Sequence, residues 1–182
     1  MAGQYQYCDL TLGGSERDCT GAVGGIARVL IAAAKDIKTI TIDENGMVSA
    51  ITPVTEEGKP FHEYWCKKGT AVFNTTYTPS ETSDGTHANT ILFQLQKMKS
   101  KNRDEYLKLV AGETIVLFQD NNELWWLLGT PTLPATATAG DGTSGQAITD
   151  YNGFNVTLGT TDRTTPPEVE PDIVEPLIAV AA

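Results

Sequence analysis

Short segments that are apolar, or that alternate between apolar and polar residues, follow one another from Asp43 onward, and turn residues separate them. This pattern is typical of an antiparallel β sandwich or barrel. Residues 40–42 and 47–51 flank the sequence Asp43-Glu44-Asn45-Gly46, in which the Asn-Gly pair favours the positive φ angles of a tight hairpin. We therefore predict a mainly β fold with a hairpin at this turn.

Two further strands and a long loop are predicted next. Residues 61–66 and 71–78 alternate in side-chain character, which indicates one strand each. Residues 78–89 are polar and have almost nothing to bury, so they predict a loop at the tip of a hairpin. Residues 90–98 then predict the returning strand.

Residues 114–118 and 123–128 predict a second hairpin, in which successive residues are apolar. Both of its faces must therefore be covered, one by the sandwich core and the other by a helix or a neighbouring subunit. Trp125 and Trp126 point to opposite faces of their strand, so we expect one in the core and the other at an interface.

One short helix is predicted over residues 102–111. Asn102 and Glu105 resemble a capping box, helical spacing of apolar residues follows, and Gly112 ends the helix. Residues 22–37 fit a helix slightly better than a strand on local evidence. Residues 131–142 are a low-complexity run of Thr, Ala and Pro, and residues 147–149 with 154–158 predict a last hairpin.

The length and the net charge of the chain limit the classes of protein to which it can belong. A chain of 182 residues with 40% hydrophobic residues can bury a core without disulfides or a structural metal. Thirteen basic and 23 acidic residues give a net charge of −10, which argues against binding to nucleic-acid phosphates. No apolar run is long enough to span a membrane, and the first ten residues do not resemble a secretion signal. We therefore expect neither a membrane-spanning segment nor a secretion signal.

The sequence contains few candidate residues for catalysis or metal binding. Cys8, Cys19 and Cys66 are an odd number of cysteines and read as reduced thiols, with a pair between the first two left open. No Cys-x-x-Cys motif supports a metal site. His62 and Cys66 would be about 13 Å apart on one strand, too far for direct proton transfer. We therefore predict no enzyme, no cofactor and no metal, and keep a carbohydrate-binding β sandwich as the alternative of another class.

The last 19 residues differ in composition from the rest, so we divide the chain into a β-sandwich domain, residues 1–163, and an acidic, proline-rich arm, residues 164–182. The arm holds four prolines and no basic residue, which favours an extended conformation. A solvated tail is one interpretation, but its apolar residues favour docking on a neighbour. The predicted subunit interface comprises Trp126, Leu128, Ile173, Val174, Leu177 and Ile178.

Taken in order, these features resemble structural proteins of tailed bacteriophages that infect Bacteroidota, in particular tail-tube-like and head-tail ring proteins. The resemblance covers residues 8–158. It is carried by the lead-in between Cys8 and Cys19, Gly24-Gly25-Ile26, Asp43-Glu44-Asn45-Gly46, the predicted helix, Asp120-Asn121-Asn122, Leu124-Trp125-Trp126-Leu127-Leu128-Gly129, Ser144-Gly145 and Tyr151-Asn152-Gly153.

The resemblance implies a β sandwich or barrel with a flanking helix, assembled as six or twelve copies into a ring that DNA crosses during ejection. It implies that residues 22–37 are a strand, that the protein belongs to the virion tail or neck, and that it assembles in the host bacterial cytoplasm. Neighbouring tail or neck proteins are the expected partners, and DNA passes through without specific binding. A capsid decoration or head-fibre protein is the alternative within virions. The predicted contact between rings is the polar loop with Pro79, Glu81, Asp84 and His87.

Overall fold

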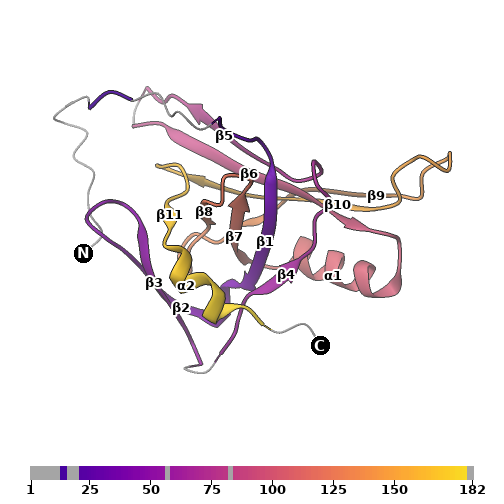
Figure 1. Cartoon of the computed structure of the whole chain (residues 1–182), viewed down its shortest axis with the longest axis horizontal. Coiled ribbons are helices and arrows are strands. Elements are labelled where there is room, and N and C mark those ends of the chain that lie inside the picture. Colours follow the sequence, from indigo (N-terminus) through magenta and orange to yellow (C-terminus); the bar gives the residue numbers. More distant parts are fainter. Residues whose placement is uncertain (1–12, 16–20, 56–57, 82–83, 180–182) are drawn as a thin grey trace.

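The computed structural model describes residues 13–15, 21–55, 58–81 and 84–179 and confirms a mainly β fold built from two open sheets. Seven strands form one sheet in the order β2-β3-β11-β8-β7-β1-β4, and four form the other in the order β5-β6-β10-β9. Figure 1 shows the strands of the two sheets crossing at a steep angle. The first sheet comprises β1 (Ile26–Ala33), β2 (Ile37–Ile42), β3 (Val48–Pro53), β4 (His62–Tyr64), β7 (Thr114–Asp120), β8 (Trp125–Leu128) and β11 (Glu168–Val169).

The second sheet comprises β5 (Val72–Thr78), β6 (Thr86–Gln96), β9 (Thr136–Thr143) and β10 (Gly153–Asp162). Helix α1 (Ser100–Ala111) packs on its inner face, where the ring of Tyr106 stacks on Phe154 with centroids 4.9 Å apart. A short helix α2 (Pro171–Val174) and the 3-10 turns η1 (Ala34–Asp36) and η2 (Glu175–Leu177) complete the described elements. Within the described residues, no helix is long and apolar enough to cross a membrane.

Two clusters of buried side chains hold the fold together. The inter-sheet core joins β1, β7 and β8 to β6, β10 and α1, with Val29, Phe118, Phe93 and Leu158 among its members. The outer core lies on the opposite face of the seven-stranded sheet and includes Leu30, Leu117, Trp125, Leu127 and Val174. The central strands of the seven-stranded sheet are therefore buried on both faces, as their continuous apolar runs require.

The predicted hairpin at Asp43-Glu44-Asn45-Gly46 is confirmed as the connection between β2 and β3, which pair antiparallel. Gly46 has φ +81°, in the region that favours glycine. The Asp43 carboxylate accepts hydrogen bonds from the backbone N–H groups of Asn45 and Met47, at 2.9 and 2.8 Å. The carboxylate thus fixes the turn.

The hairpin of β7 and β8 is also confirmed, but its cover comes from the same chain. Trp125 lies in the outer core and Trp126 packs against the inter-sheet core, so the two rings do point to opposite faces. Leu128, which we expected at a subunit interface, is 1% exposed inside the inter-sheet core. That expectation is wrong because the four-stranded sheet already covers this face.

The local preference of residues 22–37 for a helix is wrong. Residues 26–33 form β1, which lies between β7 and β4. Alternate side chains of β1 enter the two cores, Val29 and Ile31 on one side and Leu30 and Ala32 on the other. A strand buried on both faces has the same apolar run as a buried helix, so tertiary pairing decides between them.

The predicted helix is confirmed as α1, which begins two residues earlier than expected and is followed by Gly112 as its C-cap. Asn102 does not cap it. The N-cap is Lys99, and the Asn102 side-chain amide donates to the backbone carbonyls of Gln96 and Lys97. Asn102 thus ties the helix to the end of β6.

The last hairpin is displaced from its predicted place. Residues 136–143 of the low-complexity run form β9, which pairs antiparallel with β10, whereas residues 147–149 lie in the connection between these strands. Its threonines are β-branched and suit a strand, and Gly142 leaves room for the Phe154 ring. Similarly, β6 begins at Thr86, so the loop after β5 is shorter than predicted and His87 lies in a strand.

The C-terminal segment packs on its own subunit, which corrects the docking we expected. β11 is inserted between β3 and β8, and Val169 and Val174 are fully buried in the outer core. Ile173, Leu177 and Ile178 are partly buried against the same core. The outer face of β7 and β8 needs an apolar cover, and the chain's own end supplies it (Figure 1).

Candidate functional site

Trp126 lines an apolar groove of about 440 Å³ at one end of the sandwich. The groove lies where β1 and β5 begin, β7 ends and the chain approaches β11. The rings of Phe73 and Phe118 stack at its base, with centroids 4.9 Å apart. Its apolar lining includes Val23, Val72, Phe73, Phe118, Trp126 and Pro166.

One wall of the groove is held by asparagine side chains. Asn122 bonds to Val23 twice, because its Oδ1 accepts from the Val23 N–H at 2.7 Å and its Nδ2 donates to the Val23 carbonyl at 3.1 Å. Asn121 Nδ2 donates to the Gly24 carbonyl at 2.6 Å. The turn after β7 therefore fixes residues 23–25 beside the groove, although Val23 keeps about half of its surface exposed.

The two edges of the four-stranded sheet are open within the described part of the chain. β5 reads Val-Phe-Asn-Thr-Thr-Tyr-Thr and contains no charge and no proline, and most of its residues are exposed. β9 is equally exposed and carries a single charge, Asp141. Exposed edges of soluble monomers are usually protected by charged side chains or proline, so these edges favour pairing with another chain.

The outer face of the four-stranded sheet is polar but almost uncharged. Within these four strands, the pairing registers place Asp141 as the single charged residue on this face and no lysine or arginine. Asn155 Nδ2 donates to the Asp141 carboxylate at 2.9 Å. The other residues on it are chiefly Asn74, Thr76, Thr90, Gln94 and Thr157, together with the apolar pair Val72 and Leu92.

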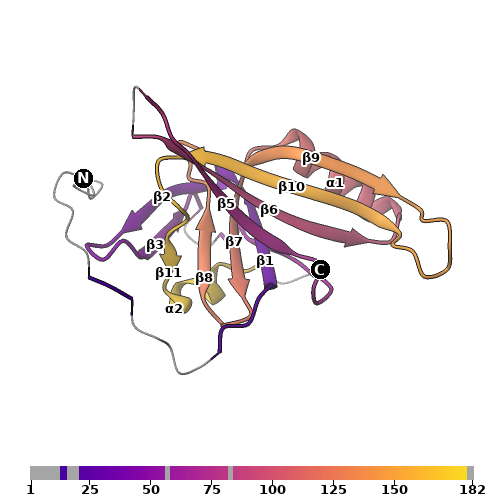
Figure 2. The same ribbon diagram turned by 90° about the horizontal axis from the view of Figure 1, so that it is seen from above.

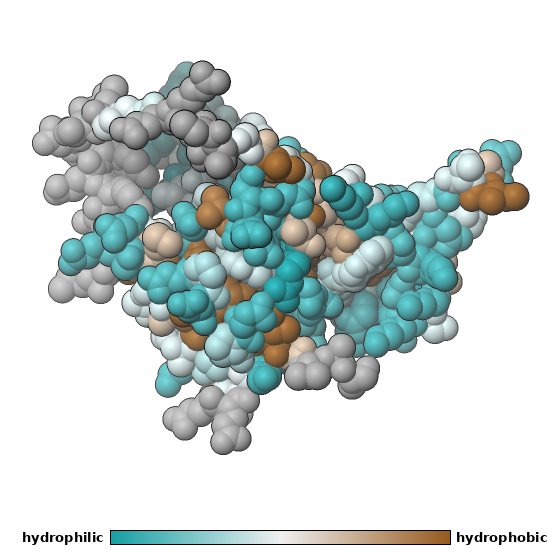
Figure 3. Space-filling model, viewed as in Figure 1, coloured by the Kyte–Doolittle hydropathy of each residue, from teal (hydrophilic) through white to brown (hydrophobic). Residues whose placement is uncertain are grey.

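The β9–β10 hairpin projects beyond the rest of the molecule in both ribbon views (Figure 1, Figure 2). Its tip is fixed by Asp150, whose carboxylate accepts from the backbone N–H groups of Gln146 and Ala147 at 2.9 and 2.7 Å. These bonds hold the pKa of Asp150 below its ordinary value. Ile148 is nevertheless fully exposed, and Figure 3 shows an apolar spot at the end of the projection.

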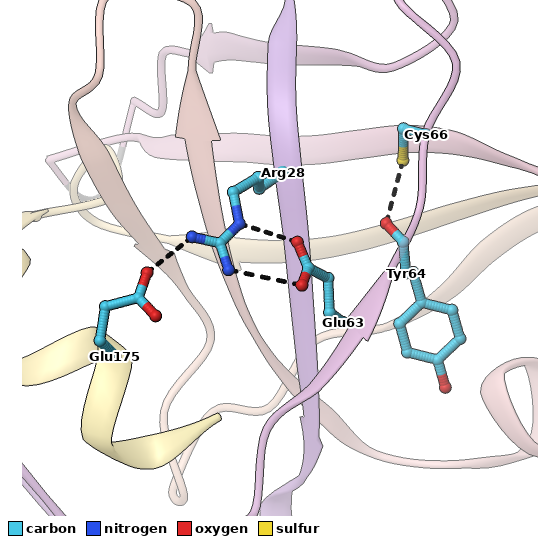
Figure 4. Close-up of polar contacts among 5 residues, drawn as sticks. All are labelled: Arg28, Glu63, Tyr64, Cys66 and Glu175. Atoms are coloured by element: carbon cyan, nitrogen blue, oxygen red, sulfur yellow. Dashed lines mark hydrogen bonds and ion pairs between the residues drawn. The ribbon is translucent and has the colours of Figure 1, made fainter. Parts of the chain in front are cut away.

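Ion pairs made by Arg28 tie the C-terminal segment to the seven-stranded sheet (Figure 4). The Arg28 guanidinium donates to Glu63 from β4 and to Glu175 from η2, each at 2.7 Å, and lies 5.3 Å from the ring centroid of Trp125. The hydrogen bond to Glu63 is the main reason why the pKa of Arg28 is raised above its ordinary value. The cluster is a structural clamp, since each of its charges has a partner.

The titratable side chains of Cys66 and Tyr64 both have hydrogen-bond partners within the subunit. Burial raises the pKa of the Cys66 thiol to about 11, and this thiol donates to the Tyr64 carbonyl at 3.5 Å, so it is a poor nucleophile. Burial raises the pKa of Tyr64, whose hydroxyl donates to Glu105 at 2.8 Å. Among the residues placed by the structure, no group of three or more His, Cys, Asp or Glu could hold a metal ion. Cys8 and Cys19 lie outside the described residues.

The predicted inter-ring loop is only partly a loop. Pro79, Glu81 and Asp84 are exposed in the connection between β5 and β6. His87 is half-buried in β6 beside Tyr77, with ring centroids 5.1 Å apart. The Tyr77 hydroxyl donates to the Asp84 carbonyl at 3.1 Å and closes the loop onto β5.

Sequence reasoning missed Ile148 and the groove. The signal for Ile148 was that it is the one large aliphatic residue between Gly145 and Gly153, a segment rich in turn and polar residues. The groove had no sequence signal, because its lining comes from five separate segments. Comparison with family models, curated proteins and solved structures finds no match to this chain.

Proposed function

We propose that this protein is a structural component of a tailed-bacteriophage virion, in which many copies assemble into a ring or tube of the tail or neck. The open edges of the four-stranded sheet carry this proposal, because β5 has no charged residue and β9 has only Asp141. β5 pairs antiparallel with β6, β6 with β10, and β10 with β9, so β5 and β9 run in opposite directions. Placing the β5 edge of one copy beside the β9 edge of the next therefore continues the antiparallel pattern.

Repeating this contact gives a closed ring or an open helix, because it joins two different edges of the same molecule. A sheet continued around a ring curves naturally, since strands twist relative to one another. Closure removes the exposed edges that a monomer leaves unprotected. The fold thus supports assembly without any further domain.

The proposed ring is a conduit for DNA. With the outer face of the four-stranded sheet toward the lumen, DNA meets chiefly threonine, asparagine and glutamine side chains, the apolar pair Val72 and Leu92, and one carboxylate per copy. A lumen without basic groups in a chain of net charge −10 does not hold the phosphate backbone. DNA therefore slides through rather than binding.

The carbohydrate-binding alternative has less support. Trp125 and Trp126 lie on opposite faces of β8, so they do not form one stacking platform. Trp65 is 70% exposed, but it stands alone after β4.

Sedimentation of the purified chain over a range of concentrations, with negative-stain images of the assembled fraction, tests the proposal. Rings or tubes support it, trimers favour the head-fibre or decoration alternative, and a monomer at all concentrations contradicts it and favours the carbohydrate-binding module. A gel-shift assay with duplex DNA in about 50 mM salt tests the conduit, and micromolar binding there would contradict it.

A further inference from the structure

The β9–β10 hairpin ends in an ordered loop that exposes the side chain of Ile148, which we call the knob. Asp150 and Asn152 order the tip, because Asn152 Nδ2 donates to the Ser144 carbonyl at 3.1 Å and its Oδ1 accepts from the Met98 N–H at 2.9 Å. Ile148 is presented by this ordered loop with its side chain fully exposed. A side chain held in place before binding loses less entropy when it is buried by a partner.

The knob cannot fill the groove of its own subunit. Ten paired positions with β6 keep β10 straight, and the hairpin tip lies at one end of the long axis, whereas β1 begins near its middle (Figure 1). The groove has room for more than one side chain, at about 440 Å³, and its lining is mostly apolar. Insertion of the knob therefore requires a second molecule.

Charge does not oppose such a contact, although the chain is strongly acidic. Asp150 is the one charged residue between Gly142 and Gly153, and its carboxylate is engaged by two backbone N–H groups. Asp120 is the one charged residue that lines the groove, and it accepts from the N–H groups of Asn122 and Leu124 at 2.8 and 3.0 Å. Each surface thus carries a single carboxylate, to which two backbone N–H groups donate.

Strand direction brings the two surfaces together. In the register that pairs β9 of one copy over its full length with β5 of the next, antiparallel pairing places the end of β9 at Thr143 beside the beginning of β5 at Val72. The tip follows Thr143 directly, and Val72 is part of the groove lining. The same pairing that continues the sheet therefore delivers the knob to the neighbour's groove.

We propose that Ile148 at the β9–β10 tip of one subunit inserts into the groove formed by Val23, Val72, Phe73 and Trp126 of the next copy of this chain. The inference rests on the proposed assembly and names the contact that sets its direction. Because the knob and the groove are different surfaces, the contact is head-to-tail and propagates around a ring or along a tube.

Ile148→Glu tests the knob and Val23→Glu tests the groove of the proposed contact. Leu107→Glu is the matched control. Leu107 is exposed on α1, away from both surfaces, and all three variants add the same charge. We expect the first two variants to raise the dissociation constant of assembly by about tenfold or more and the control to leave it unchanged. Circular dichroism melts of all three should match the unmodified chain, since each side chain is exposed.

Mixing the two variants gives the sharpest result. Val23→Glu keeps an intact knob and Ile148→Glu keeps an intact groove, so an equimolar mixture should form a one-to-one dimer that grows no further. Assembly of Ile148→Glu at the level of Leu107→Glu would overturn the knob, and unimpaired assembly of Val23→Glu would overturn the groove. If the unmodified chain remains monomeric, the proposed function itself fails; if it assembles and these variants do too, only this inference fails.

Discussion

Removing the C-terminal segment should unfold the subunit rather than merely weaken its assembly. A chain that ends at Arg163 loses β11, α2 and η2, and with them the cover of the outer core. β11 is also the strand that joins the β2–β3 hairpin to β8, because the sheet order is β3-β11-β8. Truncation therefore separates the hairpin from the sheet and exposes the apolar outer face of β7.

The loss of unfolding free energy on truncation can be estimated from the side chains that the C-terminal segment buries. Val169 and Val174 are at most 1% exposed, and burial of each valine stabilises the fold by about 1.5 to 3 kcal/mol. Together they contribute about 3 to 6 kcal/mol, before the partly buried Ile173, Leu177 and Ile178 are counted. A domain of this size has a total stability of about 5 to 15 kcal/mol. The truncation thus removes a large share of it.

Urea unfolding followed by circular dichroism measures this effect. A chain that ends at Ala179 is the control, because it keeps every contact described for the segment. Val174→Ala is a milder variant that should fold and lose about 2 kcal/mol of unfolding free energy. A chain ending at Arg163 that keeps the control's urea midpoint would refute the reasoning, and would show that the segment adds nothing to the subunit's own core.

Three further predictions follow from single side chains. Thr76→Lys places a charge on the exposed β5 edge and should raise the concentration needed for assembly without changing the melting temperature, whereas Ala111→Lys at the exposed end of α1 should change neither; equal assembly of the two variants in sedimentation would argue against edge pairing. Arg28→Met should lower the free energy of unfolding by about 1 kcal/mol, since both carboxylate partners are substantially exposed, and a loss above about 3 kcal/mol in urea titrations would mean that the ion pair is effectively buried. The pKa of the Cys66 thiol is raised to about 11 in the fold, so its contribution to stability is present at neutral pH and is lost as the pH rises toward that value; in a Cys8→Ser, Cys19→Ser chain, rapid labelling of the folded protein by a thiol reagent at pH 8 would contradict the burial.

Elements with a complete local signal were predictable from the sequence. The hairpin at Asn45-Gly46 and the paired strands around Asn121-Asn122 each contain their turn residues and their apolar pattern, and helix α1 contains its apolar spacing and is followed by Gly112. The residues that contact one another within each of these elements lie close together in the sequence. The element therefore depends little on residues elsewhere in the chain. The predicted boundaries fall within a few residues of the observed ones.

Elements that depend on distant partners were not predictable in the same way. β1 becomes a strand because β7 and β4 pair with it and two cores cover it, and nothing in residues 22–37 encodes those partners. β11 is two residues long and exists only between β3 and β8. Proline content predicted an extended arm, but residues 171–177 form α2 and η2, so that prediction is wrong for this part of the arm. Composition also does not distinguish docking on the same chain from docking on a neighbour.

The placement of charge gives the strongest reason to prefer an assembling protein to a monomer. The chain has thirteen basic and 23 acidic residues, yet β5 has none, β9 has one and the hairpin tip has one, already hydrogen-bonded. A monomer with the same fold would gain solubility from a lysine on either edge or at position 148, at little cost to stability. The two open edges, the hairpin tip and the groove carry only Asp141, Asp150 and Asp120 as charged residues. The proposed head-to-tail assembly, which joins copies from β9 to β5, uses all of these surfaces.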